Sequence, residues 1–157
     1  MKKLTPLEAK GKIQRYCAYQ ERSHQEVRDK LYSFGLFRDE VDQLLTDLIT
    51  DGFLNEERFA KAFVGGKFRM KKWGRIKIVN ALESHGLSKN CIKIGLKEID
   101  NNDYLHTLNS ILEKKGDEVD EPNIFAKRDK LSKFAIQKGY EPDLVWKILK
   151  ELFPDQR

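Results

Sequence analysis

The fold is decided by Val27-Arg28-Asp29-Lys30-Leu31-Tyr32-Ser33-Phe34-Gly35, a stretch whose pattern returns at residues 78–86 and 131–139. In every copy, apolar residues stand eight and four positions before the glycine. The agreement continues beyond the glycine, with apolar residues six, ten and thirteen positions after it. The glycines are 51 and 53 residues apart. A unit of about fifty residues is therefore written three times.

This repeat predicts an all-α chain of three tandem three-helix modules of the helix-turn-helix type. We place the modules at residues 1–51, 52–102 and 103–157. A module of this size buries too little surface to be stable alone. We therefore expect neighbouring modules to pack end to end in an elongated array.

The first helix of each module is expected over residues 4–19, 56–70 and 103–115. Asn55 is placed to accept a hydrogen bond from the first turn of the second of these helices. Ser23, followed three residues later by Glu26, forms the pattern of a capping box at the start of a middle helix.

The three equivalent glycines, Gly35, Gly86 and Gly139, should end the middle helices, because glycine readily adopts the positive φ that closes a helix. Ser88 and Pro142 suit the start of the third helices. Phe37 has no capping oxygen at the aligned position, so we expect its side chain to be packed instead. Phe53 and Leu54 should pack between the first two modules, and residues 114–122 should form a looser loop.

Composition bears on the class of protein. The chain has no apolar run long enough to cross a membrane and no secretory leader. Cys17 and Cys91 lack metal-like spacing and fit a reducing cytosol. The three histidines are scattered, and Gly65-Gly66 is not a phosphate loop because no strand precedes it. We predict a cytoplasmic protein that is not an enzyme, with no metal, no cofactor and no membrane partner.

The net charge of +5 is unevenly distributed along the chain. Residues 1–54 carry nine cations and nine acids, residues 55–102 carry eleven and five, and residues 103–157 carry ten and eleven. From Arg58 to Leu82 there are eight Lys or Arg residues and no acid. Because blocks of one sign mark a partner of opposite sign more often than a requirement of the fold, the middle module is the predicted contact surface.

A regular helix over residues 56–70 would be amphipathic, with Met70 on its apolar side together with Phe59, Ala60, Phe63 and Val64. The opposite side would carry Arg58, Lys61 and Arg69. Lys67 falls inside the apolar arc, so we expect either that it reaches the edge or that the helix bends at Gly65-Gly66.

Cations surround Trp73, a mixture that suits phosphate contacts together with an aromatic plane for stacking. The residues predicted to bind DNA or an acidic protein strip are Arg58, Lys61, Lys67, Arg69, Lys71, Lys72, Trp73, Arg75 and Lys77. The alternative is that these cations form a solvated face and that Trp73 is a core residue. Arg22 lies beside the capping box and is expected to bridge helices.

The chain from Arg22 to Gly86 resembles the RecX family of bacterial recombinase regulators. The matching strings are Arg22-Ser23-His-Gln-Glu26-Val27, Gly52-Phe53-Leu54-Asn55-Glu56-Glu57-Arg58-Phe59-Ala60 and Trp73-Gly74, with a third copy around Lys138-Gly139-Tyr140. Two positions depart from the family pattern. Asn55-Glu56 stands where two aspartates are usual, and Ile76 stands where a basic residue is commoner.

The resemblance implies a non-enzymatic regulator of the RecA recombinase. Because three repeats are already joined in one chain, we expect a monomer. Such a protein would bind in the groove of the RecA–DNA filament and inhibit strand exchange and ATP hydrolysis. Its partners would be the RecA filament and the single-stranded DNA within it, with bare DNA as a further ligand.

Two other functions stay open on the sequence. One is a helix-turn-helix DNA-binding protein acting as a transcription or architectural factor. Two of the three third helices have acidic starts, Phe37-Arg-Asp-Glu40 and Glu141-Pro-Asp-Leu144, which argues against ordinary readers of the major groove. The other is a helical adaptor that binds no nucleic acid, and the basic middle module argues against it.

Overall fold

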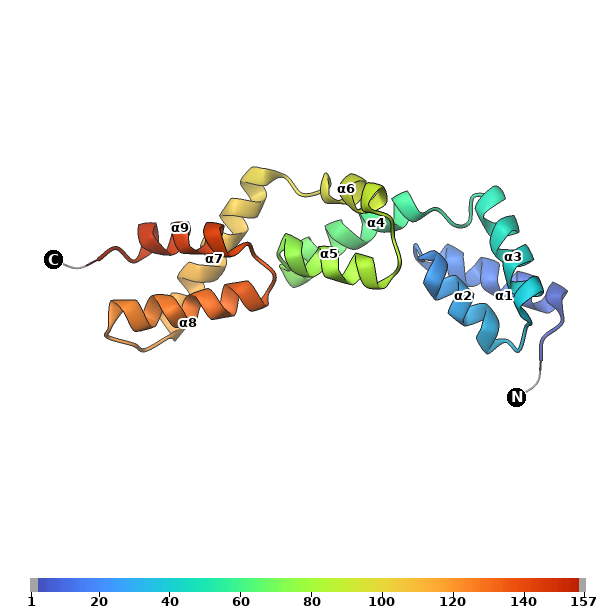
Figure 1. Cartoon of the computed structure of the whole chain (residues 1–157), viewed down its shortest axis with the longest axis horizontal. Helices are drawn as coiled ribbons and strands as arrows, with labels where there is room; N and C mark the ends of the chain where they lie inside the picture. Colours follow the sequence, from blue (N-terminus) through green and yellow to red (C-terminus); the bar gives the residue numbers. More distant parts are fainter. Residues whose placement is uncertain (1–2, 156–157) are drawn as a thin grey trace. The chain divides into compact units, whose positions relative to one another are not determined.

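The computed structural model describes residues 3–155, which form nine α-helices and one π-helical turn and contain no β-strand (Figure 1). The predicted all-α fold of three tandem three-helix modules is confirmed. The first module contains α1 (Pro6–Tyr19), α2 (His24–Ser33) and α3 (Arg38–Thr50). The middle module contains α4 (Glu56–Gly66), the π-turn η1 (Lys67–Lys71), α5 (Arg75–Ser84) and α6 (Lys89–Leu96). The third contains α7 (Asn101–Glu118), α8 (Ile124–Gln137) and α9 (Pro142–Leu152).

The apolar positions of the repeat form the core. The residues eight and four positions before each glycine are fully buried, namely Val27, Leu31, Ile78, Leu82, Leu131 and Ala135. Of the aligned positions after the glycines, only Leu96 and Leu152 are half-buried rather than buried. Gly35, Gly86 and Gly139 have φ values of 84°, 79° and 103°. The prediction that these glycines end the middle helices is therefore confirmed.

The chain packs as two compact units. The first comprises the described residues up to Phe63 together with Leu82–Gly95, and the second comprises Val64–Ala81 together with the described residues from Leu96 onward. The division runs through the middle module, so α4 and α5 each contribute residues to both units. Each outer module therefore packs with its own part of the middle module.

The predicted helix caps are present. Ser23 Oγ accepts from the Glu26 amide at 3.1 Å, and the Glu26 carboxylate accepts from the Ser23 amide at 3.0 Å. Asn55 Oδ1 accepts from the Arg58 amide at 3.0 Å, and Ser88 Oγ accepts from the first turn of α6 at 3.2 Å. The start of each of these helices is thus fixed by a local side chain.

The side chain of Phe37 was expected to be packed, but it is not. Its side chain is 69% exposed, and the Lys3 ammonium lies 3.9 Å from the centre of its ring. The Phe37 amide donates to the Glu40 carboxylate at 3.0 Å, which caps α3 without a side chain from Phe37. Phe53 and Leu54 were expected to pack between the first two modules. Leu54 is buried in the core of the first module, and Phe53 packs against that core.

One expected boundary was wrong. α7 continues to Glu118, so residues 114–118 are helical and not part of a loose loop. Within this part of α7, the ring of Phe153 occupies the space that a side chain would take at Gly116. The helix expected over residues 56–70 runs as α4 to Gly66 and continues as the π-turn η1 to Lys71, with a helical φ of −64° at Gly66.

The π-turn also changes which side chains face the core. A π-helix turns less per residue than an α-helix. Phe68 consequently lies on the buried side, with 7% exposure, whereas Met70 is 83% exposed. The placement of Met70 on the apolar side was therefore wrong.

Candidate nucleic-acid interface

Seven of the nine predicted site residues lie in the π-turn η1, in Lys72–Gly74 and at the start of α5. Lys72 ends the π-turn in the left-handed conformation, with a φ of 56°. Among the described residues it is the one position other than glycine with a positive φ. A lysine in this conformation is unusual and strained, and strained residues often cluster at functional sites.

The start of α5 is held by the third module. The amide of Arg75 donates to the Tyr104 hydroxyl at 2.9 Å, and the amide of Ile76 donates to the Gly139 carbonyl at 2.9 Å. The Gly74 amide donates to the Lys138 carbonyl at 2.8 Å. Because the first amides of a helix have no partner within it, these bonds take the place of an N-cap. The positive end of α5 thus meets the carbonyls that end α8.

Gly74 is required for this approach. A side-chain carbon at position 74 would overlap backbone atoms of Gly139 and Tyr140. The Tyr140 hydroxyl also donates to the Lys72 carbonyl at 2.8 Å. The segment before α5 is therefore fixed against the turn between α8 and α9.

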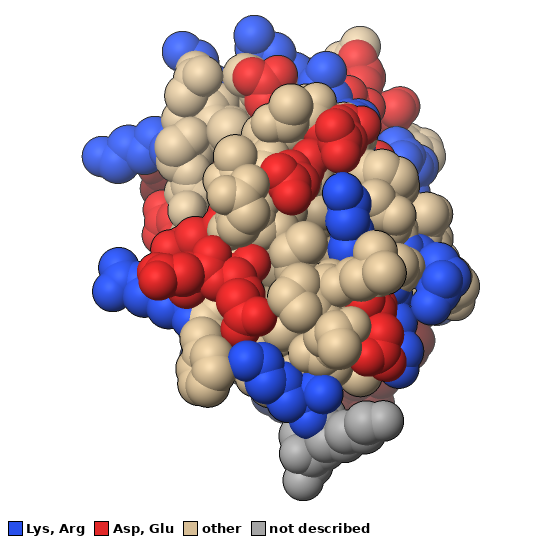
Figure 2. All heavy atoms as spheres, turned by 90° about the vertical axis from the view of Figure 1, so that its right-hand side faces the viewer, with Lys and Arg blue, Asp and Glu red and all other residues tan. Residues whose placement is uncertain are grey.

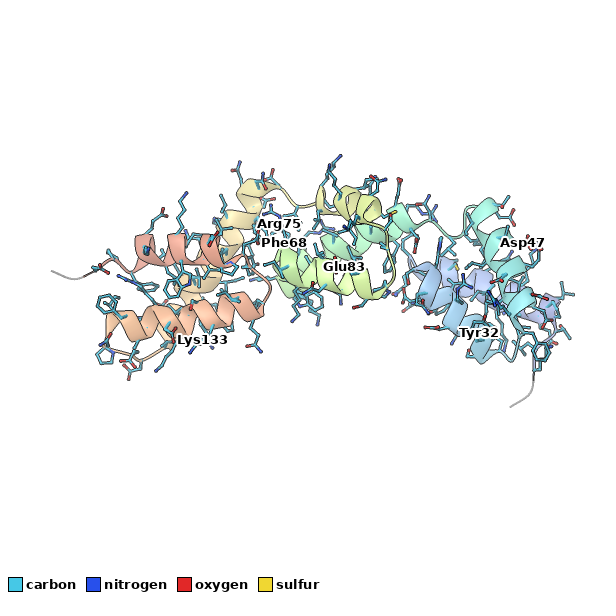
Figure 3. The ribbon with its side chains drawn as sticks, in the orientation of Figure 1. Tyr32, Asp47, Phe68, Arg75, Glu83 and Lys133 are labelled. Carbon is cyan, nitrogen blue, oxygen red and sulfur yellow. The ribbon has the colours of Figure 1, made fainter. Side chains whose placement is uncertain are left out.

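The side chain of Arg75 connects the start of α5 to the third module. Its guanidinium lies 3.9 Å from the centre of the Tyr104 ring and donates to Asn101 Oδ1 at 2.5 Å and to the Glu141 carboxylate at 3.2 Å. The same tyrosine ring stacks against Phe68 from η1, and Figure 3 shows Phe68 and Arg75 next to each other. Arg75, predicted as a contact for a partner, is thus occupied within the protein.

Tyr104 is the centre of this arrangement. It is fully buried, and its hydroxyl donates to Glu141 while it accepts from the Arg75 amide. Burial, and then the hydrogen bond to Glu141, raise the pKa of Tyr104 well above its usual range. The phenol therefore stays neutral and keeps its donor at every pH at which the fold is studied.

Trp73 is half-buried, and two lysines contact its ring. The ammonium of Lys67 lies 4.9 Å from the centre of its ring, and that of Lys77 lies 4.5 Å away. Lys67 thus reaches an aromatic ring at the edge of the core, as one of its two predicted placements required. These cation–π contacts hold two positive charges beside one aromatic surface.

The third module adds a cation that the sequence reasoning missed. Lys138 Nζ donates to the Lys71 carbonyl at 3.5 Å. Burial, and then the nearby charges of Lys77 and Lys72, lower the pKa of Lys138. The charge count could not reveal this residue, because the third module is almost neutral as a whole. The sequence signal that could have located Lys138 is its position one residue before Gly139, the glycine of the third repeat.

Arg58 and Lys61 belong to the first unit, whereas the other seven predicted residues belong to the second. Arg58 donates to the Glu21 carboxylate and to the Gly52 carbonyl, both at 2.9 Å. Lys61 is exposed. The structure therefore brings together a smaller cluster than predicted. We define the basic cluster as Lys67, Arg69, Lys71, Lys72, Trp73, Lys77 and Lys138.

Arg22 has the helix-bridging role that was expected for it. Its Nε donates to the Tyr16 carbonyl at 3.0 Å, and its guanidinium lies 3.7 Å from the centre of the Tyr16 ring. It fastens the end of α1 to the start of α2.

Comparison with known proteins bears on the identity of the chain. The family model described as RecX, second three-helix domain, matches residues 55–96. A protein of Clostridium perfringens (strain SM101 / Type A) named Regulatory protein RecX is 30% identical over 133 residues, which are 83% of this chain and 62% of that protein. The namesake from Clostridium tetani (strain Massachusetts / E88) is 28% identical over 151 residues, 93% of this chain and 68% of that protein. The chain belongs to the RecX family.

A solved structure shows the same fold. The crystal structure of RecX from Lactobacillus salivarius superposes with a TM-score of 0.84 at 22% identity, covering 94% of this chain and 96% of that one. The Clostridium perfringens relative is longer, since this chain spans 62% of its length.

The strings that resemble the RecX family lie largely where one module contacts the next, and we call each of these contacts a joint. Trp73-Gly74 and Lys138-Gly139-Tyr140 meet each other in the second unit. In the first unit Ser23 Oγ lies 3.0 Å from His85 Nδ1, beside Gly86, and His24 Nδ1 lies 3.6 Å from the Glu56 carboxylate. Much of the resemblance therefore reflects how consecutive modules are joined.

Within residues 3–155, no three His, Cys, Asp or Glu side chains gather in a way that could hold a metal ion. No helix in that same range combines the length and the apolar character needed to cross a membrane.

Proposed function

We propose that this RecX-family chain regulates a RecA recombinase by binding in the groove of the RecA–DNA filament and inhibiting strand exchange and ATP hydrolysis. The relatives are named regulatory proteins, which supports a regulatory role. In this proposal the basic cluster contacts the phosphates of the DNA strand or an acidic strip of the recombinase. Lys61, in the first unit, would add a second point of contact.

The observation that carries this proposal is the way the lysines are presented. Lys71, Lys72 and Lys77 are exposed, and the chain from Arg58 to Leu82 contains no acid. Gly74, Arg75 and Tyr140 fix the backbone between them. Such a fixed set of cations loses little conformational entropy when it binds an anionic partner.

A charge-reversal variant tests the proposal. Lys71→Glu/Lys72→Glu/Lys77→Glu should weaken binding to RecA-coated single-stranded DNA by at least about tenfold, because phosphate contacts depend strongly on the number of cations. The measurement is a pull-down of coated strand at several salt concentrations, together with the RecA ATPase rate.

The control carries the same change of charge elsewhere in the second unit. Lys130→Glu/Lys133→Glu/Lys147→Glu alters three exposed lysines outside the basic cluster. It should leave filament binding within about threefold of the wild type. Equal losses in the two variants, or full binding by the cluster variant with its helicity retained, would overturn the proposal.

The helix-turn-helix alternative predicts a different order of affinities. We expect coated single strand to bind more tightly than bare single strand or bare duplex at the same salt concentration. Strong binding to duplex that depends on its sequence would favour the transcription or architectural factor instead. The structure disfavours that alternative at two helix starts, where Glu40 binds Lys3 at 3.0 Å and Glu141 binds Arg75 at 3.2 Å.

A further inference from the structure

A second anionic ligand is suggested by a cavity of about 240 Å³ in the second unit. Four of its lining residues are lysines: Lys72, Lys114, Lys115 and Lys138. One acid, Glu118, lines the same cavity. We call this cavity the lysine pocket. Only Lys72 among these lysines was predicted as a site residue from the sequence.

Positive charge in the lysine pocket exceeds negative charge. The Glu118 carboxylate lies 3.6 Å from Lys115 Nζ, so one carboxylate serves four ammonium groups. Lys138 is half-buried, and its ammonium donates to a backbone carbonyl at 3.5 Å. Burial, and then the nearby charges of Lys77 and Lys72, lower the pKa of Lys138. An anion in the pocket would supply the missing negative charge.

Two apolar residues, Ile111 and Phe134, complete the lining, and Phe134 contacts two of the lysines. Phe134 has the ammonium of Lys115 at 4.7 Å and that of Lys138 at 5.7 Å from the centre of its ring. Pockets for small molecules usually have volumes of about 300–1,000 Å³. The lysine pocket is smaller, which suits phosphate groups better than a whole nucleotide.

We propose that the lysine pocket binds phosphate groups, through Lys72, Lys114, Lys115 and Lys138. The phosphates come either from a polynucleotide strand or from the polyphosphate chain of a free nucleotide. This binding requires no recombinase, so it goes beyond the regulatory function proposed above.

Titration calorimetry of the full chain with inorganic tripolyphosphate at low salt tests the proposal. Lys115→Gln/Lys138→Gln should lower the affinity at least about tenfold, because two charged donors are lost. Lys130→Gln/Lys133→Gln removes two lysines that pair with Glu121 and Asp129 outside the pocket. It should change the affinity by less than about twofold, since rim charges contribute little. No binding by the wild type, or equal losses in both variants, overturns the proposal.

A measurement on the unaltered chain makes the test independent of folding in the variants. Tripolyphosphate should raise the pKa of Lys138, followed by NMR of its side-chain carbon, because a bound anion favours the charged amine. An unchanged pKa at saturating ligand overturns the proposal.

Competition identifies the source of the phosphates. Displacement of tripolyphosphate by a short oligo-dT assigns the pocket to a strand, whereas displacement by ATP and not by oligo-dT assigns it to a free nucleotide. Displacement by neither overturns the proposal. The tripolyphosphate titration contains no recombinase and no DNA, so binding in the pocket and regulation of the recombinase can fail separately.

Discussion

The start of α2 and the start of α5 hold equivalent positions in their modules, and each meets the glycine turn of the next module. At α2, Ser23 Oγ lies 3.0 Å from Nδ1 of His85, the residue before Gly86. At α5, the Gly74 amide donates at 2.8 Å to the carbonyl of Lys138, the residue before Gly139. The same joint is thus made by side chains in the first unit and by backbone in the second.

The difference follows from where each helix finds its cap. α2 is capped by its own Ser23 and Glu26, so its joint needs only side-chain contacts. α5 obtains its caps from Tyr104 and Gly139 of the third module. The residues just before α5 therefore need not supply a capping side chain. They include Lys71 and Lys72, the second of which has a positive φ. The same repeat pattern thus gives two different joints. At the first joint the helix is capped by its own residues, and at the second the residues before the helix include exposed cations.

The surface charges differ in the same direction. Figure 2 views the side of the chain that carries α1–α3 and shows acidic and basic side chains interleaved on it. The first module contains the pairs Arg28 with Asp42 at 3.0 Å and Lys3 with Glu40 at 3.0 Å. In the basic cluster the lysines instead contact Trp73 and backbone carbonyls. Charge is thus neutralised by ion pairs within the first module and accumulates in the basic cluster.

The largest expected effect is that of Gly74→Ala, which would break the backbone joint. The added carbon overlaps the backbone of Gly139 and Tyr140, and we expect a loss of about 3 kcal/mol of stability in the second unit. The measurement is native-state hydrogen exchange at Leu108 and Leu131, which lie in the core of that unit.

Gly66→Ala is the matched control for Gly74→Ala. Gly66 has a helical φ of −64°, and a carbon added there meets no atom within 4 Å. It should leave stability unchanged or raise it by about 0.5–1 kcal/mol, because alanine favours a helix over glycine. Similar effects of the two substitutions would show that Gly74 is not a close contact.

Two arginines offer a second comparison, because Arg75 connects two modules and Arg22 connects two helices of one module. Arg75→Gln removes contacts with Asn101, Glu141 and Tyr104 and leaves Glu141 without its cation, so we expect a loss of about 2 kcal/mol. Arg22→Gln removes one hydrogen bond to Tyr16 and a ring contact, worth about 1 kcal/mol. Hydrogen exchange in α7 and α2, respectively, measures the two losses. A larger loss for Arg22 would reverse the proposed contrast.

The side-chain joint is tested by Ser23→Ala. It removes the cap of α2 and the partner of His85 together, whereas Ser88→Ala removes a cap alone. A lost serine cap costs about 1 kcal/mol, so Ser23→Ala should exceed Ser88→Ala by roughly 0.5–1 kcal/mol for the lost hydrogen bond. Exchange rates of amides in α2 and α6 measure the two losses. Equal losses would mean that the Ser23–His85 contact contributes nothing.

How far the sequence predicts this molecule depends on whether a feature is local. The repeat positions, the capping box at Ser23 and the glycine turns involve neighbours along the chain, so periodicity and capping rules located them. The role of Arg75 depends on Glu141 and Tyr104, which lie 66 and 29 residues away. Lys138 joins the basic cluster for the same reason. The charge pattern therefore located the segment in which the cations gather, but not Lys138 and the other residues of the third module that contact it.

The smallest expected effect is that of Lys72→Gly. Glycine adopts the positive φ of 56° found at Lys72 without steric cost, whereas a lysine pays about 1–2 kcal/mol for it. Part of that gain is lost to the greater freedom of glycine in the unfolded chain, so we expect the second unit to become more stable by about 0.5 kcal/mol. Binding to coated strand should fall at the same time, because one cation is lost.

The reciprocal substitution is Gly86→Ala, at the turn of the other joint. Gly86 has a φ of 79°, and an added carbon meets no atom within 4 Å. The cost should therefore be conformational alone, about 1 kcal/mol, and filament binding should be unchanged. Hydrogen exchange and the pull-down of coated strand measure both variants. If Lys72→Gly lowered stability as Gly86→Ala does, the lysine would be favourable where it stands, and its left-handed conformation could not be read as strain retained for binding.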